Sequence, residues 1–199
     1  MPTPSLHLAQ DRAADELLTS DPFALLMGML LDQQFPLERA FAAPWLLTTR
    51  LPGGRLDVRE LADYDPEALV KLMAGPPALH RYPAAMAGRI QALCRQLIDH
   101  WDGDAAALWT TAPDGAELLR RLRVLPGFGE QKARIFVALL GKRLGVRPDG
   151  WREAAGPYGQ EGSYRSAADV TDADSLARVR AFKQAAKQAA KQAGQAGPG

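Results

Sequence analysis

A five-residue turn with two glycines, Leu125-Pro126-Gly127-Phe128-Gly129, most constrains what this chain can fold into. The residues before it, ending near Leu122, and those after it, from Glu130 to Leu144, have the apolar spacing of helices. Glycine adopts backbone conformations closed to other residues and lets chain segments approach closely. The pattern predicts two helices joined by a tight turn, with Phe128 anchored in the core and Ala133 keeping the helices close.

The same turn predicts a binding site for an anion. The first N–H groups of a helix have no partner inside it, and they point at whatever lies in front of the helix. At this turn, Gly127 and Gly129 would let a phosphate come close to those groups. A contact of this kind positions a protein on DNA and carries no base specificity. The alternative is a helical hairpin with a glycine turn and no ligand.

Helix signals recur along the rest of the chain, and strand signals are scarce. Proline, alone or after an N-cap residue, marks four helix starts, at Asp21-Pro22, Pro36, Asp65-Pro66 and Pro83. A last helix begins near Ser175, whereas residues 145–164 are rich in loop-forming residues and show no clear period. We therefore expect an all-α protein.

Length and composition fit one soluble unit. The chain has 199 residues, of which 47% are apolar and 24% charged. We expect one domain over residues 1–190, followed by a flexible tail at 191–199. No apolar run approaches the roughly 20 residues that cross a bilayer, and the start lacks the pattern of a signal peptide. These features predict a cytoplasmic monomer that does not associate with membranes.

The net charge of +1 conceals an uneven distribution. Residues 175–199 contain five basic and no acidic residues, so the remainder carries a net charge of −4. A weakly acidic body counts against strong non-specific affinity for DNA, although it is compatible with a local basic patch. The basic C-terminal segment is either a DNA contact or a solvated helix.

With this turn, the chain resembles the helix-hairpin-helix superfamily of base-excision DNA repair glycosylases (HhH-GPD), which includes endonuclease III, adenine-mismatch glycosylases and alkyladenine glycosylases. Three further features carry the resemblance over about residues 23–151. Residues 21–34 look like the family's opening helix, and residues 79–98 look like its wedge loop and the helix behind it. Asp149 follows Gln131 by 18 residues, the spacing between the family's lysine position and its essential aspartate.

The resemblance implies two helical lobes that grip duplex DNA in a cleft, one over about residues 30–120 and the other formed by residues 1–30 and 120–190. It also implies that a damaged or mismatched base is flipped out of the stack, where its reacting atom becomes accessible. Gln34 would fill the space left by that base, and His80 or Arg81 would sit at the wedge. The residues expected to contact DNA are Gly127, Phe128, Gly129, Gln131, Lys132, Gln34, His80 and Arg81.

One departure from the family limits the chemistry. Bifunctional members have lysine where this chain has Gln131, and an amide forms no Schiff base, so we expect no β-lyase activity. Lys132 lies one residue further, about 100° around the helix. It is either a displaced nucleophile or a phosphate-facing or solvated lysine.

No iron–sulfur cluster is expected, because the chain has one cysteine, Cys94, which lies in an apolar helical pattern. The histidines show no metal-ligand spacing, so we expect no zinc site either. The resemblance implies a monovalent cation at the hairpin, held by the backbone carbonyls of Arg123, Leu125 and Phe128.

The base pocket that the resemblance implies would be lined by Asp32, Gln33 and Trp151, with Asp149 as the catalytic carboxylate. Such a carboxylate could stabilise a developing oxocarbenium ion or activate water. Asp149 stands between a proline and a glycine, however, so a plain turn aspartate is the alternative. Likewise, Trp151 is either a pocket aromatic or a core residue, and Asp32 either lines the pocket or caps the next helix.

These observations lead to three hypotheses. The first is a monofunctional DNA glycosylase that hydrolyses the N-glycosidic bond of a flipped base. The second is a non-catalytic binding module of the same fold that recognises DNA structure. The third is an interaction protein unrelated to DNA, whose hairpin contacts another protein.

Overall fold

The computed structural model describes residues 5–195, and over this range it consists of helices with an isolated backbone bridge and no strand. The expected all-α class is therefore confirmed for the described residues. No helix among them combines the length and apolar character that crossing a membrane requires. The elements are α1 (Arg12–Ser20), α2 (Pro22–Leu31), α3 (Leu37–Arg50), α4 (Val58–Ala62), α5 (Pro66–Ala74), α6 (Pro83–Trp101), α7 (Ala107–Thr110), α8 (Gly115–Arg123), α9 (Glu130–Arg143), α10 (Trp151–Ala155), the 3-10 turns η1 (Gly156–Gly159) and η2 (Ala167–Asp169), and α11 (Ala173–Gln195).

The N-cap signals act as expected. The carboxylate of Asp21 accepts the N–H of Phe23 at 2.9 Å, and Asp65 caps α5 with its own carboxylate. Each cap satisfies a donor that the helix itself leaves free. The sequence analysis missed α1 and α4, which begin in the same way after Asp11 and Asp57.

Two segments that we expected to be irregular contain helix. Residues 145–164 include α10 and η1 between stretches of loop. Trp151 begins α10, and its ring lies against Gly141 of α9, a tertiary contact that no local period reveals. The tail expected from residue 191 is helical as far as Gln195, while residues 196–199 lie outside the described part of the chain.

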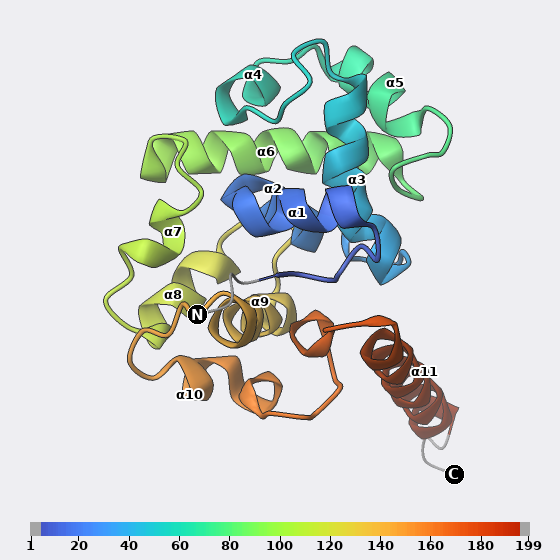
Figure 1. Ribbon diagram of the computed structural model, residues 1–199, viewed down its shortest axis with the longest axis vertical. Helices are drawn as coiled ribbons and strands as arrows, with labels where there is room; N and C mark the ends of the chain where they lie inside the picture. The colour runs from blue at the N-terminus through green and yellow to red at the C-terminus, as the bar shows by residue number, and fades with distance from the viewer. Residues whose placement is uncertain (1–4, 196–199) are drawn as a thin grey trace.

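The helices form two groups (Figure 1). In one group α1 and α2 pack on α3, while α4 and α5 pack on α6; in the other, α8, α10, η1 and η2 surround α9. Residues 12–31, which we expected beside residues 120–190, pack on α3 in the first group. A single cluster of buried apolar side chains runs through both groups, so the two share one core.

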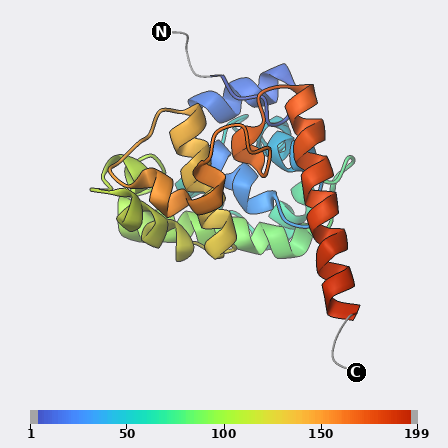
Figure 2. The same cartoon turned by 90° about the horizontal axis from the view of Figure 1, so that it is seen from below.

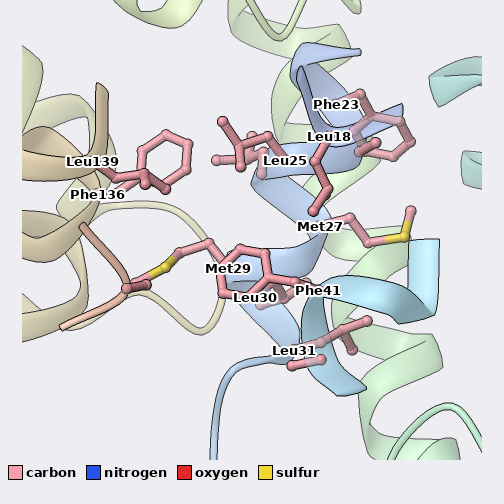
Figure 3. Close-up of a cluster of buried hydrophobic side chains, with 14 of the residues drawn as sticks. Leu18, Phe23, Leu25, Met27, Met29, Leu30, Leu31, Phe41, Phe136 and Leu139 are labelled. Carbon is pink, nitrogen blue, oxygen red and sulfur yellow. The ribbon is translucent and has the colours of Figure 1, made fainter. Parts of the chain in front are cut away.

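Helix α2 connects the two groups because it is apolar on every side. All residues from Phe23 to Leu31 are buried, as expected of a helix without a polar face. Met27 and Met29 point in opposite directions, Met29 toward the side on which Phe136 and Leu139 of α9 lie (Figure 3). The last carbonyls of α2 are enclosed as well, and they need hydrogen-bond partners from the protein.

A buried ion pair fastens the segment before α11 to the end of α9. Lys142 Nζ lies 2.7 Å from Asp169 Oδ1, and both side chains are almost fully buried. The second carboxylate oxygen accepts the backbone N–H of Arg165 at 2.8 Å and the hydroxyl of Ser163 at 3.1 Å. With these partners the charge of Asp169 is compensated and its lone pairs are used.

Removing one member of this pair should destabilise the fold. Lys142→Met leaves the Asp169 carboxylate buried without a counter-charge, and we expect a loss of about 3–5 kcal/mol in the free energy of unfolding. Arg12→Met is the matched control, because Arg12 forms a solvent-exposed ion pair with Glu16 and should leave the urea midpoint unchanged. Equal midpoints for the two variants would show that the buried pair does not hold this segment.

Candidate nucleic-acid interface

The turn that joins α8 to α9 is anchored in the core as predicted. Phe128 is 5% exposed, and its ring meets that of Phe136 edge to face at 6.1 Å between centroids. Ala133, in the first turns of α9, is fully buried. The apolar side chain between the two glycines therefore fixes the turn, while both glycines stay exposed.

Gly127 and Gly129 differ in backbone conformation and in what surrounds them. Gly127 has a φ of +77°, and a Cβ there would lie 2.5 Å from Leu30 Cδ1 and 3.3 Å from Gln33 Nε2. Its bare backbone thus packs against the end of α2. Gly129 has an extended backbone, and apart from its chain neighbours no atom of the surrounding structure lies within 4 Å of the position its Cβ would take. The fold therefore leaves room for a side chain at Gly129.

Gly129 stands at the start of α9. Gly129 is the N-cap of this 14-residue helix, and no side chain caps it. The Glu130 carboxylate pairs with Arg123 at 2.7 Å and with Arg134 at 2.7 Å. The acidic residue of the first turn is therefore outweighed by two guanidinium groups, and the helix start suits an anion.

Lys132 has a role that the sequence analysis did not consider. Its Nζ donates to the carbonyls of Met29 at 2.8 Å and Leu30 at 3.1 Å, so it caps the C-terminal end of α2. Burial lowers the pKa of Lys132 to about 8, with the nearby Asp32 carboxylate acting in the opposite direction. This ammonium holds the enclosed end of α2 against the start of α9.

Gln33 connects this end of α2 to its surroundings. Its side-chain Nε2 donates to the carbonyl of Leu30 at 2.5 Å, and its Oε1 accepts from the guanidinium of Arg89 on α6. Its backbone carbonyl lies 3.1 Å from Nε2 of His80. One residue therefore links α2, α6 and the loop before α6.

His80 is a structural residue that positions its neighbours. The ring is 1% exposed, and its Nδ1 accepts the backbone N–H of Tyr82 at 3.0 Å while Nε2 bonds to Gln33. Burial lowers the pKa of His80, with the charges of Lys132 and Arg89 adding to the effect. A neutral imidazole with its proton on Nε2 satisfies both bonds. It leaves Arg81 and Tyr82 exposed beside it.

A surface hollow of about 580 Å³ lies next to His80, and Gln34, Phe35, Arg39 and Arg81 are among its lining residues. Gln34 is exposed at its rim with a φ of +53°. The guanidinium carbon of Arg39 lies 4.7 Å from the centre of the Phe35 ring. A guanidinium over an aromatic ring offers the hollow a positive charge for phosphates and a planar group on which a base can stack.

Asp32 follows α2 directly, as its C-cap residue. Its expected role as a cap of the next helix is wrong, because α3 begins after Pro36 with no side-chain cap. Its carboxylate is largely buried and lies 3.6 Å from the Nζ of Lys183, on α11. We call Arg39, Arg81, Arg89 and Lys183 the cationic face. The sequence analysis identified Arg81 alone as a site residue, because the others come from α3, α6 and α11 and no local pattern links them.

The structure does not bring Asp149 to the turn. The Asp149 carbonyl accepts the N–H of Gly115 at 2.7 Å, at the start of α8, whereas the turn follows the end of α8. Eight residue steps of helix separate the two sites by about 12 Å. Trp151 is a core residue, 6% exposed, with its ring against Gly141. Gln131 hydrogen-bonds to neither Asp149 nor Trp151: its side-chain amide donates to the Tyr158 hydroxyl at 2.9 Å.

The carbonyls expected to hold a cation lie at the same turn, and that of Leu125 already accepts the N–H of Phe128 at 3.0 Å. No group of His, Cys, Asp or Glu side chains within residues 5–195 is arranged to hold a metal ion.

Comparison with known proteins adds no assignment: no family model, no curated protein and no solved structure matches this chain.

The lowered pKa of Lys132 predicts a pH-dependent stability. Between about pH 8 and pH 10.5 the native protein holds a neutral Lys132, whereas the unfolded chain still binds the proton, so raising the pH through this range favours the native state. We expect the free energy of unfolding of the wild type, relative to Lys132→Met, to rise from pH 8 to pH 10 in urea titrations. The exposed Lys187, changed to Met, is the control and should show no such trend. A difference that stays constant with pH would contradict the buried ammonium.

Proposed function

We propose that this protein binds duplex DNA through the exposed turn 125–129 and serves base excision repair, as the resemblance to helix-hairpin-helix glycosylases implies. One observation carries the proposal: α9 begins at Gly129 with no side-chain cap, and the position that a side chain of this residue would take is unoccupied. Backbone amides in that position bind a phosphate oxygen without any side chain in between. Such a contact is independent of base sequence and sets the register of the protein on the duplex.

The charges around the turn support the same partner. A Cβ on Gly127 would lie 3.7 Å from Cδ of Arg89, so the turn adjoins the cationic face. Arg89, Gln33 and His80 form a connected chain of contacts from the turn to the hollow beside Arg81. The weakly acidic body therefore carries a local basic surface at the place where a duplex seated on the turn would pass.

The reaction that fits this arrangement is hydrolysis of the N-glycosidic bond of a flipped base. It needs a carboxylate close to the DNA, either to stabilise the sugar cation or to activate water. Asp149 lies at the far end of α8, whereas Asp32 lies beside Lys132 and the turn. We therefore assign the carboxylate role to Asp32, with Gln131 and Asp149 outside the reacting site.

The position of Asp149 also favours a second candidate, a module that binds DNA and breaks no bond. In that case Asp32 serves only to balance Lys132 and Lys183. The two candidates share the DNA contact and differ in whether a base is released.

Gly129→Asp tests the DNA contact. An Asp at this N-cap can accept the free amides of α9, so we expect the free energy of unfolding to rise by about 0.5 kcal/mol. The same carboxylate occupies the phosphate position, so affinity for a 20-base-pair duplex should fall by about tenfold or more, measured by fluorescence anisotropy. Gly53→Asp adds the same charge in the loop between α3 and α4 and should leave affinity unchanged. An unchanged affinity in Gly129→Asp would exclude the turn as the contact.

Asp32→Asn and Asp149→Asn separate the two candidates. Base release is measured on duplexes that carry uracil, alkylated, oxidised or deaminated bases. For a glycosylase we expect Asp32→Asn to lower the single-turnover rate by about 100-fold, because the general base is lost, and Asp149→Asn to match the wild type. Loss of activity in Asp149→Asn alone would refute the assignment to Asp32. Duplex binding without release of any base by the wild type would establish the second candidate.

A further inference from the structure

We infer that the exposed part of α11 is a cationic arm that lies along the sugar-phosphate backbone of DNA beside the turn contact. The cationic arm consists of Lys183, Lys187 and Lys191, with the helix that carries them. This inference rests on the proposed function and adds a second contact to it, one that the turn and the hollow do not supply.

The arm is attached to the body at one end only. Leu176 and Val179 of α11 are buried, and Arg180 forms an ion pair with Glu38 on α3. Lys183 then contacts Asp32, and from residue 184 to residue 193 every residue is exposed. Figure 2 shows α11 running past the rest of the molecule toward its C-terminal end.

The composition of the arm excludes a conventional docking helix. Between residues 183 and 193 the only apolar side chains are alanines, so the helix has no apolar stripe for a coiled coil or a groove. Acidic residues are absent from residue 175 onward, and no ion pair within the described residues includes Lys187 or Lys191. A helix of this kind suits a polyanionic partner.

The lysines are spaced for a linear array of charges. Residues four apart lie on one helix face with a drift of about 40° per step, and eight residues span about 12 Å. Gln184, Gln188 and Gln192 each follow one of the lysines and carry no charge. Duplex DNA carries about one phosphate charge per 1.7 Å of its axis. The stripe therefore spans several phosphates.

DNA is the polyanion that the position of the arm favours. Lys183 is both the first lysine of the arm and a member of the cationic face, through its contact with Asp32. Lys183 thus lies where the cationic face meets α11. A duplex held at the turn would leave its flanking backbone within reach of this stripe.

The test is the salt dependence of DNA binding by the full chain with Lys187→Gln and Lys191→Gln combined. Each phosphate contact contributes about 0.9 to the slope of log K against log salt concentration. We expect the slope for a 30-base-pair duplex to fall by about 1.8. The affinity ratio of wild type to variant should then shrink by about 12-fold between 50 and 200 mM salt. Gln188→Ala with Gln192→Ala is the matched control on the same helix and should retain the wild-type slope.

The outcomes distinguish the arm from the turn. Circular dichroism should show unchanged helix content in the lysine variant, because Gln is a good helix former. An unchanged slope, together with weakened binding in Gly129→Asp, would overturn the arm and leave the proposed function standing. No duplex binding by the wild type at any salt concentration would overturn both. Binding of the wild type to anionic phospholipid vesicles that the variant loses, with the DNA slope unchanged, would assign the arm to a lipid surface instead.

Discussion

The bond between Lys132 and the end of α2 is the interaction on which the rest of this structure depends. Helix α2 is buried on every side, so its last carbonyls cannot turn to water, and leaving one of them unpaired would cost about 1–3 kcal/mol. Lys132 donates from α9 to the carbonyls of Met29 and Leu30, and Gln33 adds a second bond to that of Leu30. Burying the ammonium costs free energy, and the lowered pKa of Lys132 reflects this cost. In return, the bond joins α2, which runs through the core, to α9, which begins at the turn. Gly127 permits the same approach by presenting no side chain to Leu30.

This joint gathers groups that are far apart in the chain. Gln33 follows α2, Arg89 lies on α6, His80 precedes α6, and Lys183 lies on α11. Each makes a polar contact close to the end of α2, and two of them, Arg89 and Lys183, are charged and exposed. The chain as a whole is almost neutral, so the basic surface is a product of folding and not of composition. Because it adjoins the exposed turn, a single anionic ligand can contact both.

Sequence reasoning succeeded where the signal is local. The turn, its Phe128 anchor, and the helix starts marked by an N-cap and proline depend on residues within one or two helical turns of each other. It failed where the position of a residue depends on the path of the chain through the fold. The number of residues between Gln131 and Asp149 does not determine where in space the chain runs after α9. After α9 the N–H of Val146 bonds to the carbonyl of Leu140, and the chain stays at the far end of that helix. Lys132 was visible in the sequence, but its partners are about a hundred residues away.

The contrast between Gly127 and Gly129 separates what the fold requires from what a ligand requires. At Gly127 a methyl group would collide with Leu30, so packing alone explains the glycine. At Gly129 the backbone is extended and the space is empty, and a side chain would fit. Ser or Asp there would also bond to the free amides and stabilise α9. A glycine N-cap holds α9 only slightly less well than Ser or Asp would, so packing does not require glycine here and helix stability weakly disfavours it. A phosphate oxygen that binds the free amides needs this position without a side chain, and that is the reason we propose for Gly129.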